Sequence, residues 1–348
     1  MAGRYQRRDQ GSQKDNGVLP KMAKTRKILV TGGLGLIGHN VVQRLQQAGH
    51  EVVVTDIKTN YGIIPQSEVD YLYLERAKKL DPSTKIYHED IADQIGQECL
   101  FRTYQFDTVI HLASFPRQKV VNANPMSGSR VMSEGLLNLL ELSSRYGVDK
   151  FVYVSSSMVY GDFQDQVTED AVCRPQGQYG IMKLAGEWLT RDYTRKTGMA
   201  HVVIRPSAVY GPYDVEDRVI SKFLLTAMRR GVIKVNGATE TLDFTYVDDA
   251  ADGIAAAAVN ESANNNTYNI TKSHSHSLLA AAELAVKIVG RGTIEVRDRD
   301  LDFPSRGALN IAAARRDLGF DPKVDIEEGF QRYHDWIVNS LYWSKKAV

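Results

Sequence analysis

The sequence predicts an α/β protein built on a doubly wound parallel sheet, followed by a smaller C-terminal α/β region. Two observations support this fold class. From Lys27 onward, short runs of β-branched residues alternate with helical patterns, as expected for parallel strands joined by crossover helices. After Pro206 this alternation gives way to loops, short strands and short helices, which predicts a smaller region over one edge of the sheet.

The alternating part is expected to contain six strands and four helices. Three of these helices end at Gly49, Gly147 or Gly198, and glycine is the residue type that most readily takes the left-handed conformation at a helix end. The expected strands are 28–31, 51–56, 85–91, 108–113, 151–155 and 201–205, and the expected helices are 37–48, 70–79, 125–146 and 178–197. Further helices are expected near 219–228, 248–259 and 277–289.

The composition excludes several classes of protein. The 348 residues, 43% of them hydrophobic, suffice for one large or two fused domains. Lys and Arg (43) balance Asp and Glu (42), so no overall charge field would hold nucleic acid or an anionic membrane. The longest apolar segment, 254–259, is far too short to cross a hydrocarbon layer of roughly 30 Å.

Cysteine and histidine usage gives no sign of a metal site. The two cysteines, Cys99 and Cys173, lie far apart, which argues against a disulfide scaffold or a zinc site and favours the cytoplasm. His274 and His276 are close in sequence but lack a third ligand. We therefore expect no metal.

A glycine-rich segment between the first strand and the first helix predicts a dinucleotide site. Residues 31–38 read Thr-Gly-Gly-Leu-Gly-Leu-Ile-Gly, and Gly33, Gly35 and Gly38 are expected to line a pyrophosphate held by free N–H groups at the positive helix end. Asp56 ends the second strand, at the separation of about 20 residues where a carboxylate binds the adenosine ribose hydroxyls. Because this carboxylate repels a 2′-phosphate, NAD is expected rather than NADP.

Tyr179 and Lys183 form the candidate catalytic pair. They are four residues apart at the start of a predicted helix, so both side chains leave the same face one turn apart. A phenol with a pKa near 10 is a poor base at neutral pH, but a nearby ammonium and the positive nicotinamide favour its phenolate. The serines 155–157 follow the fifth strand, at the sheet edge where ligands gather, and a hydroxyl there can share the proton of a substrate.

Together these motifs resemble the extended short-chain dehydrogenases/reductases, in particular the NAD-dependent epimerase/dehydratase family typified by UDP-galactose 4-epimerase. The resemblance covers about residues 27–336. It implies a Rossmann sheet, bound NAD, a nucleotide-sugar substrate and a homodimer packed through the helices 125–146 and 178–197. The matching segments are the glycine turn and residues 111–114, 155–161, 179–183, 205–212, 243–249 and 305–307.

The resemblance also implies roles for individual residues. Ser156 takes the place of the catalytic Ser or Thr, Tyr179 that of the base, and Lys183 that of the group that grips the nicotinamide ribose. The substrate is expected to contact Ser156, Ser157, Arg218 and Arg306, although the two arginines either bind phosphate oxygens or form surface ion pairs. The cofactor is expected to contact Gly32, Gly33, Gly35, Leu36, Ile37, Gly38, Asp56, Asp90, Ile91, Leu112, Ala113, Ser114, Val154, Tyr179, Lys183 and Pro206.

Asp90 has two interpretations, since its carboxylate either bonds the adenine amino group or caps a helix. In domain terms, residues 1–24 are expected to form a disordered tail and 25–205 the NAD-binding domain, with part of 241–272 packing back on it. Residues 206–348 are expected to form mainly the substrate-binding region.

The expected reaction is 4-epimerisation of a nucleotide-linked sugar through a transient 4-keto intermediate. Dehydratases that resemble this family carry an Asp-Glu pair where this chain has Ser157 and Met158, and related decarboxylases carry a Glu at the Met158 position. Three departures from the family pattern, Met132, Ala208 and Leu242, weaken the substrate assignment. Ala208 and Leu242 support a net sugar oxidoreductase as an alternative. A third interpretation is a non-catalytic NAD-binding regulator on the same fold. The presence of all three catalytic candidates, Ser156, Tyr179 and Lys183, argues against it.

Overall fold

The central sheet has seven parallel strands in the order β11-β6-β5-β4-β1-β2-β3. The computed structural model describes residues 25–60, 62 and 64–342, so the expected tail 1–24 lies outside the described residues. The strands of the sheet are β1 (Lys27–Thr31), β2 (Glu51–Thr55), β3 (Lys85–Tyr87), β4 (Thr108–His111), β5 (Lys150–Val154), β6 (Ala200–Pro206) and β11 (Asn266–Ile270).

Both faces of this sheet are covered, as its sequence pattern requires. Successive residues of a strand point to opposite faces, so Val30 and Val152 pack in the hydrophobic cluster beneath α1 and α9, while Leu29 and Phe151 pack in the cluster beneath α3, α6 and α7. The covering helices are α1 (Leu36–Gln47), α3 (Gln94–Tyr104), α6 (Leu136–Arg145), α7 (Gly177–Thr197), α9 (Val247–Val259) and α11 (Ala312–Leu318).

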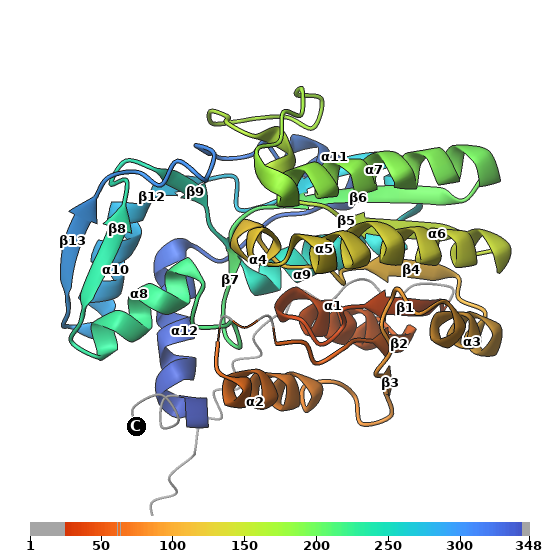
Figure 1. Cartoon of the computed structure of the whole chain (residues 1–348), viewed down its shortest axis with the longest axis horizontal. Coiled ribbons are helices and arrows are strands. Elements are labelled where there is room, and N and C mark those ends of the chain that lie inside the picture. The colour runs from red at the N-terminus through yellow and green to blue at the C-terminus, as the bar shows by residue number, and fades with distance from the viewer. Residues whose placement is uncertain (1–24, 61, 63, 343–348) are drawn as a thin grey trace, which may run out of the picture.

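The smaller region lies at the left end of the molecule in Figure 1. Its core is a separate cluster that includes Phe223, Phe330 and Tyr333, joined by Tyr71 and Leu72. Short strands pair in twos here, β10 with β7, β12 with β9 and β13 with β8. The elements are α8 (Val219–Met228), α10 (Leu278–Val289), α12 (Ile326–Asn339), β7 (Val209–Tyr210), β8 (Val232–Asn236), β9 (Thr241–Asp243), β10 (Thr245–Tyr246), β12 (Ser275–Ser277) and β13 (Thr293–Arg297). Tyr71 and Leu72 reach this core from α2 (Gln66–Ala77), which connects β2 to β3.

The predicted fold class is confirmed, with differences at several elements. Gly49, Gly147 and Gly198 have the positive φ expected after helices. β3 ends at Tyr87, which pairs with Thr55, the last residue of its neighbour β2, so Asp90 and Ile91 lie in the loop beyond it. The expected helix 125–146 is divided into α5 (Pro125–Ser129), a π-helical turn (Arg130–Gly135) and α6, while β11, α3, α4 (Gln118–Ala123), α11 and α12 were not predicted.

The described helices include none that combines the length and the apolar composition needed to cross a membrane. His274 and His276 lie with ring centres 4.6 Å apart, and no third metal-ligating side chain joins them within the described part of the chain.

Candidate active site

A cleft of about 1150 Å³ opens at the carboxyl ends of the sheet strands and extends to the smaller region. The structure brings every sequence-predicted site residue to its lining except Gly33. A Cβ on Gly33 would lie 2.7 Å from Cγ1 of Val54, so this glycine instead allows the turn to pack on β2. The cleft also receives side chains that the sequence did not single out, among them Arg76, Arg130 and Asp214.

The glycine turn leaves no room for side chains where β1 meets α1. Gly32 has φ +69°, and a Cβ there would lie 2.6 Å from the backbone nitrogen of Ala113. A Cβ on Gly38 would lie 2.1 Å from the carbonyl oxygen of Gly32. The first turn of α1 can therefore approach the turn closely and point its free N–H groups into the cleft, an arrangement that fits a pyrophosphate.

Asp56 is fixed at the end of β2 by the backbone. Its Oδ2 accepts a hydrogen bond from the N–H of Leu34 at 2.8 Å. Burial raises the pKa of this carboxyl to about 6, and the nearby Arg76 partly opposes the shift. Arg76 reaches in from α2 and donates to the carbonyl oxygens of Leu34 at 3.1 Å and Tyr213 at 2.6 Å. Only the folded chain brings this arginine to the glycine turn, so no local sequence pattern predicts its place there.

The loop after β3 places Asp90 and Ile91 in the cleft. Asp93, not Asp90, caps α3, because its side chain accepts from the N–H groups of Ile95 and Gly96. Asp90 accepts from the N–H of Ala92 at 3.0 Å and pairs with Arg130 at 2.9 Å. Asp90 therefore does not cap α3 but lines the cleft paired with Arg130, and its contact with adenine stays a prediction.

Ser156, Tyr179 and Lys183 meet at one point of the cleft. Ser156 caps a 3₁₀ turn (Ser157–Tyr160), with Oγ accepting from the N–H of Met158 at 3.2 Å. Lys183 is 4% exposed and donates from Nζ to the carbonyl oxygen of Val154 at 2.8 Å. Its Nζ lies 5.9 Å from the ring centre of Tyr179.

The electrostatics of this pair differ from the sequence-based expectation. Burial raises the pKa of Tyr179, against the lowering effects of a hydrogen bond from Ser156 and of the charges of Arg218 and Arg306. Burial lowers the pKa of Lys183 to about 7. In the protein without cofactor, Tyr179 is therefore a protonated phenol, and the cations that favour its ionisation are arginines rather than Lys183.

Arg218 and Arg306 both act on the phenol by their charge, and the side chain of Arg218, 34% exposed, pairs with a buried acid. Arg218 Nε is 3.8 Å from Oδ1 of Asp214, a carboxylate that is only 2% exposed. Burial lowers the pKa of Arg306 to about 10. A second acid, Asp217, pairs with Arg117 at 2.9 Å and Lys119 at 3.1 Å. This side of the cleft thus gathers cations suited to an anionic ligand.

Ala208 occupies a strained position in the lining of the cleft. It has φ +36°, in the left-handed region that a residue with a Cβ adopts at a cost. We expect Ala208→Gly to raise the free energy of unfolding by about 1 kcal/mol in a urea titration. Ala280→Gly, in the exposed first turn of α10, should instead lower it by about 1 kcal/mol. Equal losses in both variants would contradict the assigned strain.

Comparison with known proteins gives this site its context. The model of the NAD dependent epimerase/dehydratase family matches residues 28–271. An uncharacterized UDP-glucose epimerase of Bacillus subtilis is 29% identical over 323 residues, spanning 91% of this chain and 99% of the relative. UDP-glucuronate 4-epimerase of Thermodesulfobacterium geofontis is 29% identical over 322 residues, spanning 88% and 95%.

Relatives with other activities match at similar levels. UDP-glucuronic acid decarboxylase 1 of Arabidopsis thaliana is 28% identical over 319 residues, spanning 89% of this chain and 69% of the relative. The dTDP-glucose 4,6-dehydratase of Salmonella typhimurium is 27% identical over 348 residues, spanning 91% and 94%. Family membership alone therefore does not select one reaction.

Among solved structures, UDP-glucuronic acid 4-epimerase from Bacillus cereus, in complex with UDP-glucuronic acid and NAD, superimposes with a TM-score of 0.82. It is 27% identical and spans 90% of this chain and 99% of its own. The family match covers well over half of the chain, and the cleft has the glycine turn and acidic strand end suited to NAD. The chain belongs to the NAD-dependent epimerase/dehydratase family of the extended short-chain dehydrogenases/reductases.

Proposed function

We propose that this protein is a nucleotide-sugar epimerase that inverts C4 of the sugar through a transient 4-keto intermediate. The observation that carries this proposal is the meeting of Ser156, Tyr179 and Lys183 in the cleft that also holds the glycine turn. The similarity to the epimerases of Bacillus subtilis and Thermodesulfobacterium geofontis supports it, because this chain matches nearly the whole length of both relatives.

Each residue has a task in this scheme. Tyr179 acts as its phenolate, which the charges of Arg218 and Arg306 and the positive nicotinamide favour, and takes the proton of the C4 hydroxyl. Ser156 hydrogen-bonds the oxygen as its charge changes. Lys183 holds the nicotinamide ribose, while Arg218 and Arg306 bind the diphosphate of the substrate. When bound, NAD would supply the hydride acceptor and donor for this carbon.

The cleft lacks carboxyl groups at the two positions, 157 and 158, where related dehydratases and decarboxylases carry their acid–base residues. Ser157 is 1% exposed, and its hydroxyl donates to Oγ of Ser207 at 3.1 Å. Met158 is 6% exposed and has no ionisable group. Because neither position supplies a carboxyl group, these two side chains favour epimerisation over both reactions.

The proposal is tested by incubating the purified protein, without added cofactor, with UDP-, GDP-, CDP- and dTDP-sugars. We expect one class to be converted to its C4 epimer with no accumulation of NADH absorbance. Net oxidation is the second candidate, favoured by Ala208 and by Leu242, an apolar residue in the cleft lining. Stoichiometric NADH with an oxidised sugar would replace epimerisation by that reaction.

We also propose that residues 25–205, with part of 241–272, form the NAD-binding domain, and that 206–348 mainly bind substrate. Two contacts support the return of part of 241–272 to this domain. Helix α9 packs on α1, and β11 pairs in parallel with β6, although some sixty residues separate the two strands in the chain. The smaller region contributes Arg218 and Arg306 to the cleft.

The affinity for NAD is expected to depend on pH through Asp56. Its pKa is raised to about 6, so the carboxylate that would accept the ribose hydroxyls is present above pH 6 and lost as the pH falls below it. We expect NAD binding to weaken about tenfold between about pH 7 and about pH 5, measured by calorimetry. Asp56→Asn should bind weakly with a flat profile, and a flat profile in the unmodified protein would argue against this role.

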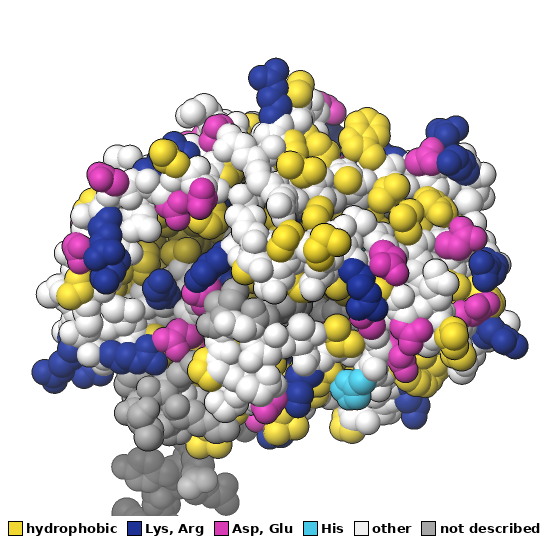
Figure 2. All heavy atoms as spheres, in the orientation of Figure 1, with side chains coloured by type: hydrophobic (Ala, Val, Ile, Leu, Met, Phe, Trp, Pro, Cys, Tyr) yellow, Lys and Arg dark blue, Asp and Glu magenta, His cyan; other side chains and the backbone are white. Residues whose placement is uncertain are grey.

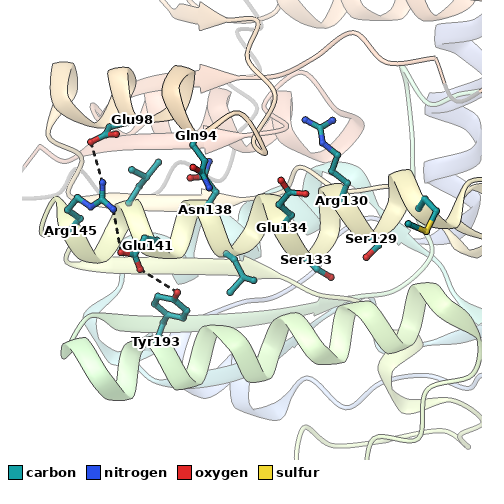
Figure 3. A pocket seen from close by; sticks show the side chains of 13 residues that line it. Gln94, Glu98, Ser129, Arg130, Ser133, Glu134, Asn138, Glu141, Arg145 and Tyr193 are labelled. Carbon is teal, nitrogen blue, oxygen red and sulfur yellow. Dashed lines mark hydrogen bonds and ion pairs between the residues drawn. The ribbon is translucent and has the colours of Figure 1, made fainter.

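We further propose a homodimer packed through α5, α6 and α7. Figure 2 shows hydrophobic side chains gathered on this face. On these helices, Met126 is 82% exposed, Ile181 53% and Trp188 63%. A groove of about 690 Å³ runs along it between α3 and α7. At the left end of the groove in Figure 3, a chain of contacts runs from Glu98 through Arg145 and Glu141 to Tyr193.

Light scattering is expected to give the mass of two chains for the unmodified protein. Trp188→Glu places a charge in the apolar face and should yield monomers that keep their NAD affinity. Val172→Glu provides the matched control, since Val172 is 74% exposed but lies outside these helices, and it should remain dimeric. A monomeric unmodified protein would end the proposal.

A further inference from the structure

A buried pair of opposite charges lies behind Lys183, and the proposed chemistry does not use it. Glu187 is fully buried and sits one turn after Lys183 on α7. Arg205, near the end of β6, is 3% exposed. Its Nε donates to Oε1 of Glu187 at 2.9 Å and its Nη2 donates to Oε2 at 2.7 Å. This bidentate contact fixes both the position and the orientation of the carboxylate.

Two further donors complete the surroundings of Glu187. Oγ of Ser155 donates to Oε1 at 2.7 Å, and Nη2 of Arg191 donates to Oε2 at 3.2 Å. Each oxygen thus accepts two hydrogen bonds. Lys183 instead donates to the carbonyl oxygen of Val154, so Glu187 acts on Lys183 through space, in an interior that screens charges weakly.

Four titratable groups face Lys183 from the elements packed against it: Glu187 and Tyr179 on α7, Tyr153 on β5 and His111 on β4. Burial raises the pKa of both tyrosines and lowers that of His111 to about 3, so these three are neutral near pH 7. Of the four, Glu187 alone is charged, and it opposes the lowering of the pKa of Lys183 by burial.

We propose that Glu187 is a positioning residue that keeps Lys183 charged and directed at Val154, and that Arg205 sets how much of the negative charge Lys183 experiences. This inference rests on the proposed function, because the charge of Lys183 matters there as the group that holds the nicotinamide ribose. It goes beyond that function by naming the residues that keep Lys183 charged, Glu187 and Arg205.

Arg205 has anchors of its own, which allows its charge and that of Glu187 to be removed separately. Its Nη1 donates to the hydroxyl of Tyr160 at 2.9 Å and to the carbonyl oxygen of Glu169 at 3.0 Å. The hydroxyl of Tyr160 in turn donates to Oδ1 of Asn269 at 2.8 Å, on β11. Replacing Glu187 therefore leaves Arg205 held by these groups.

The test compares two variants that break the same ion pair but change the charge near Lys183 in opposite directions. Glu187→Gln removes the negative charge, so the midpoint of Lys183 ionisation should fall by about one pH unit. Arg205→Gln leaves the negative charge less compensated, so the midpoint should rise. Ser155→Ala removes a hydrogen bond but no charge, and should leave the midpoint in place.

The midpoint is measured on the full chain without cofactor, by competitive acetylation over a range of about pH 5 to about pH 10 with mass spectrometry of the Lys183 peptide. Lys183 is 4% exposed and lines the cleft, so the reagent must reach it through the cleft, and the reaction is run long enough for Lys183 to be acetylated. Lys78, whose side chain is 60% exposed, serves as the reference. Circular dichroism establishes folding of each variant. This readout needs no turnover, so it can fail or succeed independently of the proposed epimerase activity.

Opposite shifts support the inference. Shifts in the same direction, or an unchanged midpoint in a folded Glu187→Gln protein, overturn it, because a purely structural ion pair would give one of these results. If Glu187→Gln does not fold, Arg205→Gln carries the test alone, and a midpoint that stays or falls overturns the inference.

Discussion

Tyr179→Phe is expected to lower turnover of the nucleotide sugar about 1000-fold while leaving NAD affinity within about twofold. The substitution removes a single oxygen, the atom that would take and return the proton of the sugar hydroxyl. Lys183, whose pKa burial lowers to about 7, is another group of the cleft that can exchange a proton near neutral pH, but in the proposed scheme it holds the nicotinamide ribose. Steady-state kinetics and calorimetry measure the two quantities on the same preparation.

Tyr104→Phe is the matched control for this experiment. Tyr104 lies at the end of α3, and its hydroxyl contacts that of Tyr87 at 2.5 Å, outside the residues that line the cleft. Its loss should leave turnover unchanged. Full activity of Tyr179→Phe, with substrate and NAD affinities intact, would remove the base from the proposed mechanism.

Gly38→Ala is expected to weaken NAD binding about 100-fold and to lower the free energy of unfolding by about 3 kcal/mol. The added Cβ would lie 2.1 Å from the carbonyl oxygen of Gly32 and 2.8 Å from Cα of Gly33, so α1 must move away from the turn. The clash involves backbone atoms, which no change of rotamer relieves. Urea titration and calorimetry measure the two losses.

Gly290→Ala separates the effect on the cofactor from general loss of stability. Gly290 ends α10 with φ +73°, and a Cβ there would meet nothing within 4 Å. This variant should lose about 1 kcal/mol of stability and keep its NAD affinity. Normal NAD affinity in Gly38→Ala would contradict the fit between the glycine turn and the pyrophosphate.

Local sequence patterns predicted the parts of the site that depend on one strand–helix junction or one helix face. The glycine turn and the Tyr179–Lys183 spacing are of this kind, because the residues that matter are neighbours in sequence as well as in space. Glu187 lies four residues after Lys183 on the same helix face, so its nearness to Lys183 is also a local feature of the sequence. A single carboxylate at that spacing does not, however, indicate a role. Its meaning depends on Arg205, which reaches it from another strand.

Long-range placement accounts for most of what the sequence did not predict. Arg76 reaches the glycine turn from α2, and Arg130 reaches Asp90 from a π-helical turn after β4. The seventh strand, β11, was not predicted as a strand, although part of its segment 241–272 was expected to pack back on the NAD-binding domain. Its partner β6 is separated from it by the first elements of the smaller region, so no local pattern shows that the two strands pair. The raised pKa of Tyr179 follows from burial, a property of the assembled cleft that the helical spacing of Tyr179 and Lys183 does not contain.

Epimerisation by hydride return at C4 is tested most directly by following the converted nucleotide sugar by NMR in heavy water. Hydride removal and return at a single carbon, with Tyr179 handling only the hydroxyl proton, predicts a C4 epimer that carries no carbon-bound deuterium. Deuterium appearing at C3 or C5 of the sugar would show that a C–H proton exchanges with solvent, and would contradict epimerisation by hydride return at C4.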